Sequence, residues 1–226
     1  MKLNTNSNVY TIVYAAVMVI IVAFLLAFVS LALQEIQDNN VKKDVKKQIL
    51  AALNVEANDA TVDNLYDEMI VDKLAKGTEL TDYTGDFQTS YFKEIKDGNY
   101  HVFVATVNGE TKYVFPVYGA GLWGPIWGYV SVNADRNSVF GVSFNHQGET
   151  AGLGAEITNK EKFQVQFASK KVLNANGDVA LTVTKSGAAR GENECDGIAG
   201  ATLTSNGVRD MLKESLGNYK EFLNAK

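Results

Sequence analysis

The feature that most constrains the fold of this chain is an uninterrupted apolar run near its N-terminus. No charged residue occurs between Lys2 and Glu35, and residues 9–33 are almost wholly apolar. A helix needs about 20 such residues to cross roughly 30 Å of hydrocarbon, so this run is long enough to span a membrane with some tilt. A cleaved signal peptide, the alternative, usually has an apolar stretch of about 7 to 15 residues. We therefore predict a short N-terminal tail over residues 1–8 and a transmembrane helix over residues 9–33.

The charges beside the run bear on its orientation. Lys2 alone precedes it, whereas four lysines follow it: Lys42, Lys43, Lys46 and Lys47. Because lysine and arginine are enriched in cytoplasmic flanks, this count by itself would place the C-terminal part of the chain in the cytoplasm. The rule is weakest for a short N-terminal tail followed by a large domain.

The pattern after the run predicts a helical stalk. Val41, Val45, Ile49 and Leu53 recur every four residues, which places them on one stripe of an amphipathic helix. We predict a juxtamembrane helical stalk over residues 34–58. A single domain is then expected over the rest of the chain, residues 59–226.

The remaining residues predict an α+β domain with a mostly antiparallel sheet and flanking helices. Asn108-Gly109 separates two runs of period two and is typical of a tight β-hairpin, because both positions tolerate positive φ. The expected strands cover residues 100–107, 112–117, 127–133, 138–145 and 179–184. The expected helices cover residues 61–74, with Asp59 or Thr61 as the cap, 161–168 and 205–216.

Composition and charge exclude several classes of function. The net charge is -5, and the 21 Lys and Arg residues form no basic cluster beyond residues 42–47, so there is no electrostatic footprint for nucleic acid. Cys195 is the only cysteine, and there are two histidines. A thiolate-held metal centre or a transition-metal site built by this chain alone is therefore not expected. Redox chemistry in this chain would need an organic cofactor.

The densest candidate site is the segment CDGIAGATLTSNGV at residues 195–208. Small residues precede Thr202, and two more hydroxyls, Thr204 and Ser205, stand at the expected N-cap of the C-terminal helix. Small side chains let backbone amides approach a bulky anion, and a helix N-terminus adds free N–H groups and about half a positive charge. The segment predicts either a phosphate site or an ordinary loop with a Ser or Thr cap.

Three segments resemble motifs of a known family. Residues 196–202 are similar to the flavinylation motif Asp-x-x-Ser/Thr-Gly-Ala-Thr of the FMN-binding domains in sodium-translocating NADH:quinone oxidoreductase and in Rnf complexes. Residues 146–155 resemble that family's Glu-Thr-Pro-Gly-Leu-Gly segment, and residues 119–124 its Gly-x-Gly-Leu-Trp segment. Ala199 stands where the family usually has Ser or Thr, and Ala151 where it often has Pro. The motifs keep the family's order behind an N-terminal span, and the resemblance is closest to the C subunits of the sodium-translocating enzyme.

The resemblance implies a flavin site. In the family the last threonine of the motif is joined to FMN by a phosphoester bond, and the matching residue here is Thr202. The other cofactor contacts that we expect are Asp196, Gly200, Ala201, Thr204, Ser205, Thr150, Gly152, Leu153, Gly154 and Trp123. The small residues would leave room for the phosphate, and Thr204 and Ser205 would donate hydrogen bonds to its oxygens. Asp196 would orient the motif, help a flavin transferase to dock, or form a simple Asx-turn.

The resemblance also implies a function. Members of the family are covalent-FMN electron carriers, subunits of an ion-translocating NADH:ubiquinone oxidoreductase in the bacterial inner (cell) membrane. They relay single electrons between an iron-sulfur centre and the flavin of a neighbouring subunit. Expected partners are the other subunits, a flavin transferase and membrane lipid, and the soluble domain is expected to be periplasmic, against the lysine count. The alternatives are the G subunit of an Rnf complex and a membrane-anchored binding module without covalent flavin.

The sequence also indicates which tasks fall to partners. No carboxylate lies within residues 9–33, so sodium conduction would belong to other subunits. The Gly-x-Gly-x-x-Gly spacing at residues 119–124 leads into another predicted strand and does not open a helix, so this chain is not expected to bind NADH.

Overall fold

A computed structural model describes residues 7–225, without the side chains of residues 92, 93 and 96. The tail predicted over residues 1–8 lies outside the described residues, apart from Ser7 and Asn8. The first element, α1, is one helix over Asn8–Ala52. Among the described helices it is the one long and apolar enough to cross a membrane, and its apolar window is not buried. This helix fits a single-pass membrane anchor.

The chain forms two compact units, one up to Lys42 and one from Lys43 onwards. The last turns of α1 belong to the second unit, where Ile49 and Leu50 are fully buried. The domain therefore begins inside the segment predicted as a stalk, because the apolar stripe of that segment forms part of the domain core.

The end of α1 is fixed by its backbone. Asn54 adopts a left-handed conformation with φ 57°. The N–H of Val55 donates to the carbonyl of Leu50 at 3.0 Å, the bond that closes a Schellman cap. The helix therefore ends at Ala52, not at residue 58 as predicted.

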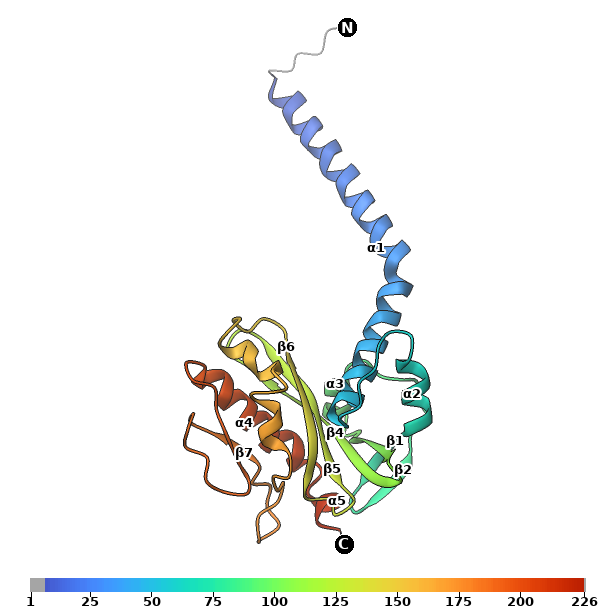
Figure 1. Ribbon diagram of the computed structural model, residues 1–226. Coiled ribbons are helices and arrows are strands. Elements are labelled where there is room, and N and C mark those ends of the chain that lie inside the picture. The colour runs from blue at the N-terminus through green and yellow to red at the C-terminus, as the bar shows by residue number, and fades with distance from the viewer. Residues whose placement is uncertain (1–6, 226) are drawn as a thin grey trace. The chain divides into compact units, whose positions relative to one another are not determined.

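A six-stranded antiparallel sheet forms the centre of the second unit (Figure 1). Its order is β2-β1-β3-β4-β5-β6. The strands are β1 (Ile70–Lys76), β2 (Glu79–Asp82), β3 (His101–Val107), β4 (Glu110–Ala120), β5 (Pro125–Asn133) and β6 (Val139–His146). Asn108 and Gly109 have φ of 52° and 82°, as a type I′ hairpin between β3 and β4 requires. Both the predicted hairpin and the α+β class are confirmed.

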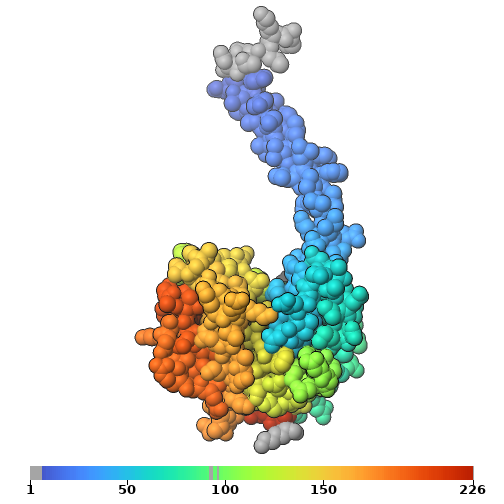
Figure 2. All heavy atoms as spheres, in the orientation of Figure 1, coloured from blue at the N-terminus to red at the C-terminus, as the bar shows by residue number. Residues whose placement is uncertain are grey.

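Helices and short elements cover both faces of this sheet, as the two sides of the domain in Figures 1 and 2 show. One face carries α4 (Thr202–Gly217), α5 (Lys220–Asn224), the 3₁₀ turns η1 (Gly154–Thr158) and η2 (Gln164–Phe167), and the parallel pair β7 (Thr182–Thr184) and β8 (Glu194–Asp196). The other face carries the end of α1, α2 (Val62–Met69) and α3 (Tyr91–Lys96). Successive side chains of β4 point to opposite faces of the sheet: Val114 packs on the α2 side and Phe115 on the α4 side.

Two predicted elements are shorter than expected, one because sheet pairing replaces helix and the other because strand pairing is limited to its end. The helix predicted over residues 61–74 is α2 followed directly by β1, and residues 70–74 pair with β3. The strand predicted over residues 179–184 is limited to β7, because Val179 forms only an isolated bridge with Leu173.

A third predicted element has a different helix type. The helix predicted over residues 161–168 is the 3₁₀ turn η2. Phe163 and Phe167 both pack against Phe144 of β6, so apolar spacing that suits an α-helix is satisfied by a single tight turn. The sequence did not predict β1, β2, α3, η1, β8 or α5.

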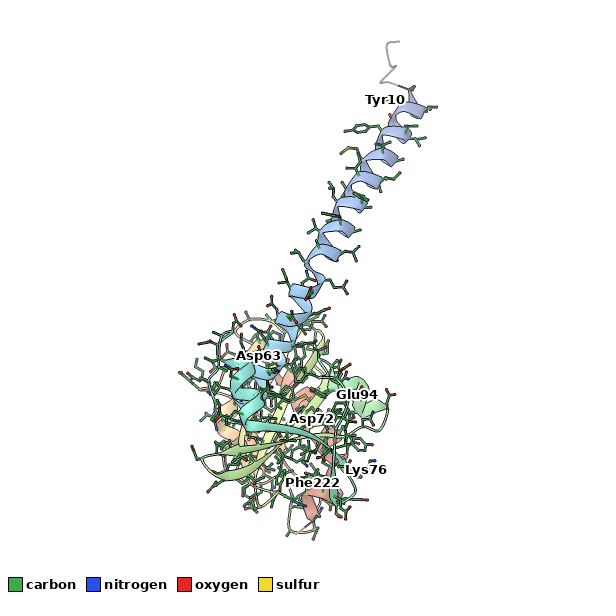
Figure 3. All side chains as sticks on the ribbon, turned by 90° about the vertical axis from the view of Figure 1, so that its right-hand side faces the viewer. Tyr10, Asp63, Asp72, Lys76, Glu94 and Phe222 are labelled. Atoms are coloured by element: carbon green, nitrogen blue, oxygen red, sulfur yellow. The ribbon has the colours of Figure 1, made fainter. Side chains whose placement is uncertain are left out.

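A buried polar cluster lies on the α2 side of the sheet. Nδ1 of the fully buried His101 is 2.9 Å from both carboxylate oxygens of Asp72. Burial raises the pKa of the Asp72 carboxyl, and the hydrogen bond from His101 opposes that rise. Glu94 of α3 is 3.8 Å from the other ring nitrogen, and Figure 3 labels both carboxylates. The cluster packs with the core away from α4, so we assign it a structural role.

Candidate functional site

The motif segment runs from β8 into the first turn of α4. Gly200 has φ 79°, a left-handed conformation, and a Cβ on it would lie 3.1 Å from Leu153. Thr202 is the first residue of α4, and its side chain is exposed. The hydroxyl predicted to carry the cofactor is therefore accessible at a helix N-terminus.

The start of α4 differs from the prediction in one respect. Ala201 is the N-cap residue and provides no side-chain cap, so Thr204 and Ser205 are not caps but lie inside the first turns. Within the described residues, the N–H groups of residues 202–204 have no backbone acceptor, whereas that of Ser205 donates to Ala201. Free N–H groups at the positive end of a helix form a suitable environment for an anion.

The hydroxyls of Thr204 and Ser205 face the protein interior. Both side chains are buried. Thr204 Oγ1 donates to Glu149 Oε2 at 2.6 Å. Ser205 Oγ donates to the carbonyl of Ala201 at 2.9 Å and accepts from the N–H of Ile198 at 3.0 Å. Each hydroxyl has one proton, and it is already used, so the predicted donation to phosphate oxygens is corrected to a role in holding the loop.

Glu149, which belongs to the 146–155 motif, contacts the 119–124 motif and the first turn of α4. Its Oε1 accepts the N–H of Trp123 at 2.9 Å. Its other oxygen accepts Thr204, so one buried carboxylate joins all three motifs. The predicted contact residues Gly152 and Gly154 belong to the same loop, where Gly152 has φ 74°. Thr150 is exposed, and its carbonyl accepts the N–H groups of residues 153 and 155.

Large apolar side chains are exposed around the motif. Trp123 is 68% exposed and Leu203, the neighbour of Thr202, is 61% exposed. Leu122 and Leu153 are also exposed. Exposed apolar patches usually mark ligand or partner contacts. Of these four residues, Leu122 and Leu203 were not predicted as site residues.

Asp196 anchors a neighbouring loop. Its Oδ1 accepts the N–H of Ala189 at 2.9 Å. Its own N–H donates to Gln166 Oε1 at 2.9 Å. These contacts are structural but are not those of the predicted Asx-turn, in which the side chain accepts from the N–H two residues on, and they favour the predicted role of orienting the motif.

The second tryptophan lies away from the motif. Trp127 is half-buried, and its Nε1 donates to Gln48 Oε1 at 3.0 Å. It alternates along β5 with Ile126, which packs on the α4 side, and so it belongs to the opposite face of the sheet. Trp123 is therefore the tryptophan available to the site.

Cys195, beside the motif, is expected to have an unreactive thiol. Its side chain is buried, and burial raises the pKa of the thiol to about 12. Because the thiolate is the reactive form, its fraction at pH 8 is far below that of a free cysteine. We expect the native chain to react with a disulfide reagent at least about tenfold more slowly than the chain unfolded in urea. Equal rates in the two states would contradict this expectation.

Comparisons with known proteins agree with this geometry. Residues 121–217 match the family model described as FMN-binding domain. The C subunit of the Na(+)-translocating NADH-quinone reductase of Haemophilus ducreyi is 33% identical, over 96% of this chain and 92% of its own length. The protein of the same name from Vibrio parahaemolyticus is 31% identical, over 88% of this chain and 87% of its own length. The crystal structure of the corresponding protein from Parabacteroides distasonis has a TM-score of 0.79 and 40% identity, covering 86% of this chain and 98% of that one.

Proposed function

The chain belongs to the family formed by the C subunits of the Na(+)-translocating NADH-quinone reductase, and from that premise we propose that it carries FMN as a phosphoester on Thr202. It is a component of a membrane-associated redox complex and contains an FMN-binding domain. In our proposal it receives single electrons from an iron-sulfur centre in neighbouring subunits. It passes them to the flavin of the next subunit on the way to quinone.

The observation that carries the proposal is the position of Thr202. Its hydroxyl is exposed at the start of α4, next to N–H groups that have no backbone acceptor within the described residues. A phosphate on this oxygen would therefore be beside the positive end of a helix. Gly200 has a left-handed conformation that other residues rarely adopt, and a Cβ there would crowd the Leu153 side chain at 3.1 Å, so glycine suits this close approach. The residues present thus fit an esterified phosphate.

The attachment step conserves atoms and electrons. Thr202 Oγ1 forms a bond to the phosphorus of the FMN half of FAD. The P–O bond of the pyrophosphate breaks, AMP leaves, and the hydroxyl proton passes to a base. A threonine hydroxyl is a poor nucleophile at neutral pH and needs activation. The neighbouring hydroxyls of Thr204 and Ser205 are engaged inside the protein, and no described side chain accepts from Thr202, which supports an external base supplied by a flavin transferase with magnesium.

The exposed apolar side chains suit the ring of the cofactor. We assign to Trp123 and Leu153 contacts with the isoalloxazine ring, with Leu122 and Leu203 beside them. Such contacts would exclude water from one side of the ring. Bound FMN supplies the one-electron chemistry, and the protein sets its position and solvent access.

The lysine count alone does not fix the orientation. Lys46 Nζ is 2.8 Å from Asp63 and Lys47 Nζ is 2.5 Å from Asp59, so both lysines form ion pairs within the folded domain. Large domains cross a membrane largely regardless of their charge, which limits the weight of the count. We propose that the domain is periplasmic, where a covalent bond also prevents loss of the flavin.

Intact-mass spectrometry of the native chain tests the proposal. We expect the mass to be raised by one esterified FMN, and the peptide that contains Thr202 to carry it. An unmodified residue 202 in an active complex would refute the electron-carrier role. It would leave a membrane-anchored binding module as the better description.

A further inference from the structure

We propose that Glu149 is a positioning residue, whose carboxylate holds the three motif segments in the arrangement in which Thr202 accepts FMN. The effect of Glu149 on FMN attachment rests on the proposed function. Its structural part, the coupling of the three segments through one side chain, stands independently.

The carboxylate bridges segments that are distant in sequence. Oε1 accepts the N–H of Trp123 at 2.9 Å, and Oε2 accepts the hydroxyl of Thr204 at 2.6 Å. Trp123 belongs to the turn between β4 and β5, and Thr204 to the first turn of α4. The side chain is only 7% exposed, so water does not replace these bonds readily. Each oxygen is fixed by a donor from a different segment.

The main chain of Glu149 is fixed as well. Its N–H donates to Nδ1 of His146 at 3.1 Å. His146 is the last residue of β6 and pairs with Ile126 of β5. The carboxylate is therefore held from the sheet, and it holds the two other segments in turn.

Two glycines leave the space that the carboxylate occupies. A Cβ on Gly121 would lie 2.4 Å from Glu149 Oε1. A Cβ on Gly154 would lie 2.4 Å from Oε2 and 2.5 Å from Thr204 Oγ1. Any side chain at either position would push the carboxylate out of its place. The glycines of the two motifs thus serve the packing of Glu149 as well as the approach of a cofactor.

The length of the Glu149 side chain, and not its charge, allows it to make both contacts. Within the described residues the ion pairs with Lys, Arg or His do not include Glu149. Both of its contacts are hydrogen bonds from neutral donors. A glutamine can accept from Trp123 and donate to Thr204 Oγ1, so it can keep both contacts. An aspartate keeps the charge but is shorter by one methylene and cannot span both donors.

The test compares five variants of the full chain, made with its flavin transferase. We expect Glu149→Ala and Glu149→Asp to lower the initial rate of FMN incorporation at least about tenfold, because small displacements of a reacting group have large effects on rate. Glu149→Gln should stay within about threefold of the parent chain. Thr204→Val, which removes one contact, should lie between these limits. The exposed Glu161→Ala is the matched control and should not change the rate.

Hydrogen exchange of the same variants without flavin separates positioning from attachment. Glu149→Ala and Glu149→Asp should speed amide exchange in the peptides covering residues 120–125 and 200–206, while Glu149→Gln should not. The inference would be overturned if Glu149→Ala showed the amide exchange and the rate of FMN incorporation of the parent chain. It would also be overturned if Glu149→Asp matched the parent chain while Glu149→Gln was as impaired as Glu149→Ala. If the parent chain takes up no FMN, the proposed function fails, and the exchange pattern alone decides the role of Glu149.

Discussion

Replacing Thr202 by valine is expected to abolish covalent flavin completely while leaving the fold intact. Valine has nearly the shape of threonine but has no hydroxyl to form the ester. The side chain is exposed at the first position of α4, so its loss should change the free energy of unfolding by no more than about 0.5 kcal/mol. Fluorescence of the denatured chain in a gel, after production with the transferase, measures the attached flavin. We expect the parent band to fluoresce and the variant band to be dark.

A serine at the same position provides the matched control. Thr202→Ser keeps a hydroxyl at the start of α4, so it should retain part of the fluorescence. Thr204→Val should also remain fluorescent, although weaker, because its hydroxyl serves Glu149 and does not form the ester. A fluorescent Thr202→Val band would show that the flavin is attached elsewhere, and the assignment of the ester would be wrong.

Local sequence patterns predict the parts of this fold that depend on neighbouring residues. The apolar run fits one long helix, Asn108-Gly109 forms the expected turn, and the last long helix lies where its period indicates. The predictions fail where contacts between segments distant in sequence determine the secondary structure. Ile70 has helical neighbours on one side, yet it pairs with Ala105 of β3, a contact that no local window contains.

The candidate site follows the same division. The motif identifies Thr202, because small residues before a helix have a recognisable pattern. The pattern does not reveal which hydroxyls face inward, and so it predicts phosphate contacts for Thr204 and Ser205, which are both buried. Glu149 contacts Thr204 across 55 positions and Trp123 across 26, so its bridging role depends on the tertiary fold. The signal for this role in the sequence is a single glutamate within a glycine-rich segment.

Replacing Gly207 by alanine is expected to have the largest effect on stability of any single methyl group added near the site. A Cβ at this position would lie 2.3 Å from the carbonyl oxygen of Ala120 and 3.4 Å from Cα of Gly121. Both are backbone atoms of the segment at the end of β4 and cannot rotate away. Overpacking of this kind costs about 1–3 kcal/mol and sometimes more, and we expect about 3 kcal/mol here because α4 must shift as a unit. For a domain of this size that corresponds to a fall in Tm of about 6–12 °C, measured on the full chain in detergent.

The same substitution elsewhere in α4 should have the opposite sign, which separates crowding from any general effect of alanine. Gly217 is the last residue of the helix, and a Cβ there would meet nothing within 4 Å. Alanine in a helix is favoured over glycine by up to about 1 kcal/mol, so Gly217→Ala should raise Tm slightly. Gly207→Ala should also reduce FMN attachment, since the turn that presents Thr202 moves with the helix. If Gly207→Ala kept the parent Tm, the close packing of α4 against the end of β4 would be wrong, and the shared placement of the three motifs would lose its support.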